Sequence, residues 1–300
     1  MAKKNKKSKL IFVNSFKGGA GKTTLSLAHC ISELFSCKND EEVYDNVIYI
    51  DLDLLGTATC YMFGEDMLPP MECFYNTQKP KQVDLKVDER EESLQIVYLS
   101  PELKNRSAFY ERSYSNHEDI IQQILRSYVQ NFINDVIKDN RVLIVFDCAP
   151  GFSKLEQEIL CDCYKLRTEG KVELREDYVT TLDAGHVLKC IHCIQESWDT
   201  FEIEPSFREI RFTINDIQNY AQYAQADLNE TEEQVIRKIA DGIGVQLGDE
   251  EERKYDIWYW KYSRQIALRS TFTSQEFVEN QVDNYILTDD NYFSIRRGNS

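Results

Sequence analysis

The amino-acid sequence predicts an α/β fold with a mostly parallel central sheet and helices on both faces. Short apolar runs of strand length alternate with longer segments in which apolar residues recur at helical spacing, as is typical of covered parallel sheets. In addition, 42% of the 300 residues are apolar, which is enough to fill one core. We therefore expect a single domain over residues 10–290, although a chain of this length can also form two.

Each element is predicted from its own pattern. Strands are expected at residues 10–13 and near residues 47, 94, 142, 177 and 208, and helices after residues 22, 117, 154, 184 and 231. The helix at residues 117–140 is the clearest, because its apolar residues form a broad stripe that we expect to pack into the core rather than form a partner groove. The stripe consists of Ile120, Ile121, Ile124, Leu125, Tyr128, Phe132, Ile133, Val136 and Ile137.

Three segments fall outside this pattern. Residues 1–9 are expected to form a disordered basic tail, with contact to phosphates as the alternative. Residues 61–118 are polar and irregular apart from a strand candidate at residues 94–99, and they predict a surface insertion or lid. Residues 291–300 are expected to form a second tail. The lysines of the first tail are Lys3, Lys4, Lys6, Lys7 and Lys9.

A glycine-rich loop lies at residues 16–24, between the first strand and the first helix. Its end matches the phosphate-binding motif G-x-x-x-x-G-K-[ST], while Phe16 replaces the first glycine and Lys17 adds a second lysine. The glycines let the backbone curl so that its N–H groups face a phosphate chain. We expect Lys22 to reach the β- and γ-phosphates, Thr23 to supply a hydroxyl to Mg2+, and Thr24 to touch the α-phosphate. The nucleotide-binding residues are then Gly18, Gly19, Ala20, Gly21, Lys22, Thr23 and Thr24.

Acidic residues follow two of the predicted strands. The strand near residue 47 ends in Asp51 and Asp53, and the strand near residue 142 ends in Asp147. Carboxyl ends of parallel strands meet at one edge of a sheet, so these acids should converge with the loop on one crevice. We expect Asp147 to hold Mg2+ through water and Asp53 to orient an attacking water, with Asp51 in support. The alternative for each acid is a plain turn former.

Three segments together resemble a known family. Residues 17–24, residues 50–53 with 56–59, and residues 146–151 are similar to the deviant Walker A, Walker A′ and Walker B segments of the ParA/MinD ATPases, in the SIMIBI class of P-loop NTPases. A weaker likeness continues through residues 178–183, and the whole resemblance covers roughly residues 8 to 216. The chain departs from partition ATPases at Leu54-Leu55, where they commonly have Pro-Gln, and at Ala149, where they commonly have Pro.

The resemblance implies a P-loop NTPase fold and a mechanism. It implies an ATP hydrolase that forms an ATP-dependent homodimer, in which Lys17 crosses the interface to contact the phosphates bound by the partner subunit. Because this cation reaches the phosphates only in the dimer, hydrolysis occurs only there and sets the lifetime of the dimer. It also implies a protein partner that stimulates hydrolysis or is gated by it. Asn215, at the end of the strand near residue 208, is similar in position to the asparagine that reads adenine, and a cap of the next helix is the alternative.

Charge and hydropathy limit the partners. The formal net charge of −16 is evidence against tight, direct DNA binding by a monomer, whereas a dimer can concentrate basic residues on one face and bind DNA nonspecifically. No run approaches 18 apolar residues, the first residues lack a secretion signal, and residues 291–300 lack the basic amphipathic helix of the MinD branch. We expect a cytoplasmic protein without a membrane partner.

Nine cysteines indicate free thiols in a reducing compartment. Cys161 with Cys163, and Cys190 with Cys193, offer two pairs of thiols, and some relatives of this class hold iron–sulfur clusters at the dimer interface. The interpretation we favour is a buried helix face, because Cys190 and Cys193 fall on an apolar helical pattern.

The sequence therefore predicts a magnesium-dependent ATPase that dimerises on ATP and acts as a nucleotide-controlled switch in DNA partition or positioning. The alternative is a regulatory ATPase subunit of a multi-protein assembly, for example a defence or secretion system, that gates a partner effector. A metal-cluster carrier is a third hypothesis.

Overall fold

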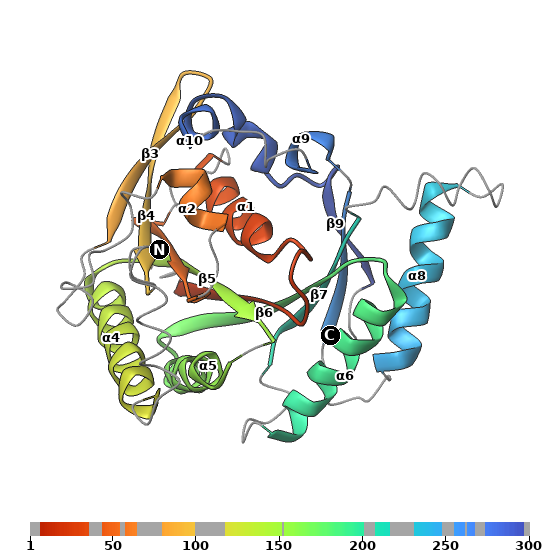
Figure 1. Cartoon of the computed structure of the whole chain (residues 1–300), viewed down its shortest axis with the longest axis horizontal. Coiled ribbons are helices and arrows are strands. Elements are labelled where there is room, and N and C mark those ends of the chain that lie inside the picture. Colours follow the sequence, from red (N-terminus) through yellow and green to blue (C-terminus); the bar gives the residue numbers. More distant parts are fainter. Residues whose placement is uncertain are drawn as a thin grey trace, which may run out of the picture.

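The computed structural model describes residues 7–35, 44–54, 58–64, 80–99, 118–151, 153–200, 208–216, 231–247, 255–261, 263–267 and 274–296. Strands and helices alternate through most of this part of the chain (Figure 1). In chain order they are β1 (Ser8–Ser15), α1 (Lys22–Phe35), β2 (Asn46–Asp51), α2 (Ala58–Phe63), β3 (Lys81–Val87), β4 (Arg90–Tyr98), α4 (Glu118–Asp139), β5 (Val142–Pro150), α5 (Lys154–Thr168), β6 (Val172–Thr180), α6 (Ala184–Thr200), β7 (Ile210–Asn215), α8 (Glu232–Leu247), β8 (Tyr255–Trp260), α9 (Arg264–Ala267), α10 (Ser274–Glu276), a π-helical turn (Phe277–Gln281), a 3-10 turn (Val282–Tyr285) and β9 (Tyr292–Arg296).

The strands form one nine-stranded sheet in the order β3-β4-β2-β5-β1-β6-β7-β8-β9. All neighbouring pairs are parallel except the two edge pairs, β3 with β4 and β8 with β9. Helices α1 and α9 with the π-helical and 3-10 turns cover one face, and α4, α5, α6 and α8 cover the other (Figure 1). The predicted α/β fold with helices on both faces of a mostly parallel sheet is confirmed.

The six predicted strands and five predicted helices are all present. Leu125 and Ile133 of the predicted stripe are 2% exposed and belong to the core formed with β1, β2 and β5, and the stripe residues from Tyr128 to Ile137 pack against that core. This part of the stripe packs into the core as predicted, whereas Ile124 is 38% exposed, and the side chains of Ile120 and Ile121 lie outside the described part of the chain. No helix in the described part of the chain is long and apolar enough to span a bilayer.

The structure differs from the prediction at the ends of the domain. Residues 292–296, expected to lie in a tail, form β9 and pair with β8, because Tyr292 packs on Trp258 and Phe293 packs on Tyr259. At the other end, β1 begins at Ser8, and burial lowers the pKa of the half-buried Lys9 ammonium to about 8. The lysines at positions 3, 4 and 6 lie outside the described residues.

Part of the segment predicted as an insertion belongs to the sheet. The strand candidate at residues 94–99 is the end of β4, which pairs with β2, and β3 pairs with β4 at the edge. Leu85 and Leu94 are fully buried on the face that α1 covers. Residues 65–79 and 100–117 of this segment lie outside the described residues.

A buried charge cluster joins helix α1 to the sheet. The Nε2 atom of His29 on α1 lies 2.7 Å from a carboxylate oxygen of Asp177 on β6, and Arg175 contacts the same carboxylate at 2.7 and 3.0 Å. Arg211 lies next to them, with its guanidinium 3.7 Å from the centre of the Trp258 ring. Burial lowers the pKa of His29 to about 4, while the guanidinium groups hold the pKa of Asp177 well below its usual range despite burial.

We expect this histidine to make the fold sensitive to mild acid. His29 takes up a proton near pH 6.5 in the unfolded chain but only near pH 4 in the fold, so its contribution is complete at neutral pH and is lost as the pH falls between these values. Asp177 adds a further loss below pH 3.8. Buried carboxyls such as Glu156, whose pKa burial raises to about 7, act in the opposite direction. The test therefore compares the pH dependence of the free energy of unfolding between the parent protein and a variant that lacks the histidine.

When the pH is lowered from 7 to 5, the parent protein should lose about 2 kcal/mol more of its free energy of unfolding than His29→Gln does. Urea titration of both proteins at the two pH values measures this difference. Equal pH dependence in the two proteins would contradict the assignment of a buried neutral histidine.

Candidate functional site

The glycine-rich loop connects β1, a central strand of the sheet, to the start of α1. Gly19 and Gly21 have φ angles of +80° and +98°, which residues with a side chain rarely adopt. A Cβ on Gly21 would also lie only 2.2 Å from the Nδ2 atom of Asn215. This amide nitrogen donates a hydrogen bond of 3.0 Å to the carbonyl of Ala20. The end of β7 therefore packs directly against the loop, and position 21 requires glycine for two independent reasons.

The two lysines of the loop have different environments. Lys22 is the first residue of α1 and is only 6% exposed. Lys17 is exposed, and its backbone is held by Ser15, whose hydroxyl accepts from the Lys17 N–H and donates to the Lys17 carbonyl. Burial raises the pKa of Asp147, and the ammonium of Lys22 opposes that rise, which indicates that this charge lies near the Asp147 carboxylate of β5. One lysine is thus part of the buried site, and the other is presented to the surface.

A short hydrogen bond joins the loop to the acid at the end of β5. The Oγ1 atom of Thr23 donates to Oδ2 of Asp147 at 2.6 Å, and Ser26 lies 3.4 Å from the other carboxylate oxygen. A hydroxyl has one proton and two lone pairs. Because Thr23 uses its proton on Asp147, its lone pairs remain available to a cation, which is the arrangement that a magnesium site at a phosphate loop requires.

The acids of β2 and β5 lie side by side. Asp51 and Asp147 are register partners on neighbouring strands and are 3% and 1% exposed. Burial, and then the charge of Asp147, raises the pKa of Asp51 well above its usual range, and burial raises the pKa of Asp147. Two desolvated carboxyls whose charges interact are costly to ionise together, and a divalent cation relieves that cost. The predicted convergence of loop and acids on one edge is observed.

The segments after these strands are also held in place. Asp53 is half-buried, and its backbone N–H donates to the Asp51 carboxylate at 3.0 Å. After β5, the buried carboxylate of Glu156 accepts from the backbone N–H groups of Ala149 and Ser153, and Ser153 caps helix α5. The last part of β5, two residues beyond Asp147, is thereby tied to α5.

Two residues of the site were not predicted as functional. The hydroxyl of Tyr49 on β2 donates to Oδ2 of Asp147 at 2.8 Å and lies 2.9 Å from the hydroxyl of Thr59 on α2. From the sequence, Tyr49 is predicted only as part of an apolar strand. Its position two residues before Asp51 is a usable signal, because residues two apart in a strand share a face.

The oxygen donors of Thr23 and Asp147 are of the hard type that Mg2+ prefers. In the described part of the chain, no group of three or more His, Cys, Asp or Glu side chains is arranged to hold a metal, so such an ion would take its remaining ligands from water and nucleotide phosphates. Among the cysteines, Cys163 and Cys190 are 1% exposed within helices α5 and α6, while Cys161 and Cys193 are half-buried.

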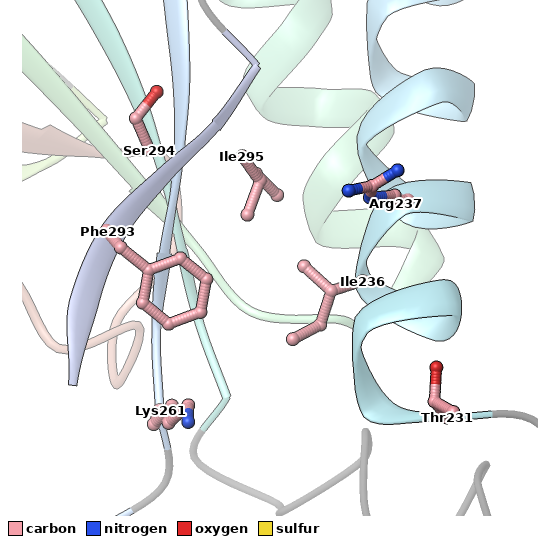
Figure 2. Close-up of a pocket in the computed structure, with 7 residues that line it drawn as sticks. All are labelled: Thr231, Ile236, Arg237, Lys261, Phe293, Ser294 and Ile295. Carbon is pink, nitrogen blue, oxygen red and sulfur yellow. The ribbon is translucent and has the colours of Figure 1, made fainter. Parts of the chain in front are cut away.

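A separate cavity of about 480 Å³ lies between α8 and β9 (Figure 2). Ile236 and Arg237 of α8 face Phe293 and Ile295 of β9 across it, with Lys261 at one end. It shares no lining residue with the loop or the acids described above, and it is not part of the candidate site.

No protein-family model matches the chain, and no curated protein matches it at a significant level. Several solved structures are similar in fold. The structure of pNOB8 ParA bound to nonspecific DNA is 11% identical, covers 94% of this chain and 86% of its own, and has a TM-score of 0.48. A plasmid partition protein from Borrelia burgdorferi is 13% identical, with coverages of 93% and 95% and a TM-score of 0.45. Cyanothece McdA in a complex with ATP is 12% identical, with coverages of 95% and 99% and a TM-score of 0.45.

These neighbours are ParA- and McdA-type proteins, the kind that the sequence motifs resemble. Because each of these TM-scores is below 0.5, we base the functional conclusion on the side chains of this chain.

Proposed function

We propose that this protein is a magnesium-dependent ATPase that dimerises on ATP and acts as a nucleotide-controlled switch, in DNA partition or positioning. The observation that carries the proposal is the 2.6 Å hydrogen bond between Thr23 of the phosphate loop and the strand-end acid Asp147, with Lys22 buried beside it. In this proposal Lys22 binds the β- and γ-phosphates, and Thr23 with Asp147 holds Mg2+, which neutralises phosphate charge when bound. Asp53 orients the attacking water.

Base recognition is assigned to Asn215. Its amide lies against Ala20, at the loop that would hold the phosphates, and this position supports a role close to the nucleotide. Reading adenine requires an amide donor and acceptor together, and on nucleotide binding the Nδ2 group would exchange the Ala20 carbonyl for the base.

The exposure of Lys17 supports its assignment to a phosphate bound by a second copy of the chain. Lys17→Ala should bind ATP with an affinity within a fewfold of the parent protein but lose at least 100-fold in kcat, because a cation that contacts the phosphates only in the dimer stabilises the transition state and not the bound monomer. Phosphate release and equilibrium ATP binding measure the two effects. Lys171→Ala, which removes an exposed lysine paired with Glu169, is the matched control.

Mixing variants tests whether Lys17 acts across the interface. A mixed dimer of Lys17→Ala and Asp53→Ala contains one site that has both Asp53 and a lysine from the other subunit, so phosphate release should return in part. If Lys17→Ala stays within threefold of the parental kcat, or if the mixture stays inactive, the assignment in trans is wrong.

A second function is favoured by the net charge of −16, which opposes binding to DNA phosphates. In that case the ATP dimer gates a partner effector in a multi-protein assembly. Retention of the ATP-bound Asp53→Ala protein on nonspecific DNA separates the two. Steeply salt-dependent retention supports partition or positioning, and no retention at low salt supports the gating role.

A further inference from the structure

Tyr49 is a buried polar residue in the middle of the sheet. It lies on β2 between β4 and β5, it is 0% exposed, and its ring is part of the core on the face that α1 covers. A phenylalanine would fill the same volume, and a buried hydroxyl stabilises a core only when its hydrogen bonds are made. Burial, and then the charges of Asp147 and Asp51, raises the pKa of Tyr49 well above its usual range, so the phenol keeps its proton.

The phenol and the loop threonine hold the same oxygen atom. Oδ2 of Asp147 accepts one hydrogen bond from Thr23 at 2.6 Å and another from Tyr49 at 2.8 Å. The first donor comes from the phosphate loop and the second from β2. The Asp147 carboxylate is therefore held by two donors, Thr23 from the loop and Tyr49 from the neighbouring strand.

The same hydroxyl also reaches helix α2. Thr59, which is 2% exposed in α2, lies 2.9 Å from the phenol oxygen and hydrogen-bonds the Asp51 carboxyl as well. Thr59 lies in the chain segment that follows Asp53. A path of hydroxyl and carboxyl groups thus runs from the acid on β5, through Tyr49, to the first turn of α2, where the single Thr59 proton serves either the phenol or Asp51.

We propose that Tyr49 is a positioning residue that orients Asp147 for Mg2+ and couples the magnesium site to helix α2 through Thr59. This inference rests on the proposed function, because it assigns to Asp147 a magnesium ion held through water. Groups that hydrogen-bond metal-binding carboxylates set their orientation, and their loss typically lowers metal affinity by 10–100-fold. Binding of Mg2+ with nucleotide then stabilises the position of α2, because Asp147, Tyr49 and Thr59 are connected.

Three substitutions that each remove one hydroxyl group and keep most of the side-chain volume test the inference. Tyr49→Phe removes both contacts of the phenol, whereas Thr59→Val keeps the contact of the phenol with Asp147 and removes the two contacts of the Thr59 hydroxyl, with Tyr49 and with Asp51. Tyr164→Phe is the matched control, since its buried phenol donates to the carboxylate of Glu176 on the opposite face of the sheet. The measurements are the Mg2+ concentration that half-saturates binding of fluorescent methylanthraniloyl-ATPγS, and amide hydrogen exchange in residues 58–63 with and without Mg2+.

We expect Tyr49→Phe to need about tenfold more Mg2+ and to lose the Mg2+-dependent slowing of exchange in α2. Thr59→Val should keep the Mg2+ requirement within about threefold but lose the slowing in α2, and Tyr164→Phe should behave as the parent protein in both. If Tyr49→Phe behaves as the parent protein in both measurements, the inference is wrong and the proposed function is unaffected. If Tyr49→Phe does not fold, unchanged slowing in Thr59→Val overturns the coupling. A parent protein that binds no nucleotide overturns the proposed function and the inference together.

Discussion

Lys22→Ala should lower the affinity for ATP at least 100-fold. Lys22 is 6% exposed at the first position of α1, so its ammonium has few positions available to it and is already desolvated next to Asp147. The substitution removes charge-assisted hydrogen bonds to two phosphates, each worth about 1.5–3 kcal/mol, and about 2.7 kcal/mol already corresponds to 100-fold. Isothermal titration calorimetry with ATP and Mg2+ measures the change.

The control for this variant is Lys165→Ala, which removes an exposed lysine of α5 that pairs with Asp162. Its ATP affinity should equal that of the parent protein. An affinity of Lys22→Ala within threefold of the parental value would show that the loop does not bind nucleotide phosphates in the proposed way.

Asp53→Ala should separate nucleotide binding from hydrolysis. Asp53 lies two residues beyond Asp51, is half-buried, and its backbone is anchored to the Asp51 carboxylate, whereas Thr23 is held by Asp147. In the proposed site Asp53 therefore lies near the nucleotide but is not a ligand of Mg2+. Loss of water orientation should reduce kcat by about 100-fold or more, while ATP affinity stays within a fewfold. The variant should therefore accumulate in its ATP-bound form.

Size-exclusion chromatography of Asp53→Ala with ATP and Mg2+ should show a long-lived species of twice the 35.1 kDa monomer mass, which reverts when nucleotide is removed. The assignment fails if the variant hydrolyses ATP at the parental rate, in which case Asp51 carries the role. A variant that stays monomeric with ATP bound would show that the chain has the phosphate loop without the dimer switch.

The parts of the site that were predictable from sequence depend on short-range patterns. The strand, loop and helix around Gly21 and Lys22 follow one another in the chain, and the approach of Asp51 to Asp147 follows from the rule that parallel strands present their carboxyl ends at one edge. Neither prediction requires knowledge of which distant side chains touch.

Other features depend on contacts between distant parts of the chain. Asn215 meets Ala20 across 195 residues, and Tyr49 reaches Asp147 across 98, so no local pattern shows that the amide packs on the loop or that the phenol holds the carboxylate. Strand β9 was missed because it is a short edge strand that depends on pairing with β8 and on the contact of Tyr292 with Trp258.

The most direct measurement is phosphate release from ATP by the purified protein as a function of protein concentration, with Mg2+ and with EDTA, for the parent chain and Lys22→Ala. We expect release that requires Mg2+, a specific activity that rises with protein concentration because the active form is a dimer, and no release by Lys22→Ala above background. A parent protein that shows no magnesium-dependent release at any concentration, or the same release after loss of Lys22, would contradict the assignment as an ATP-driven switch.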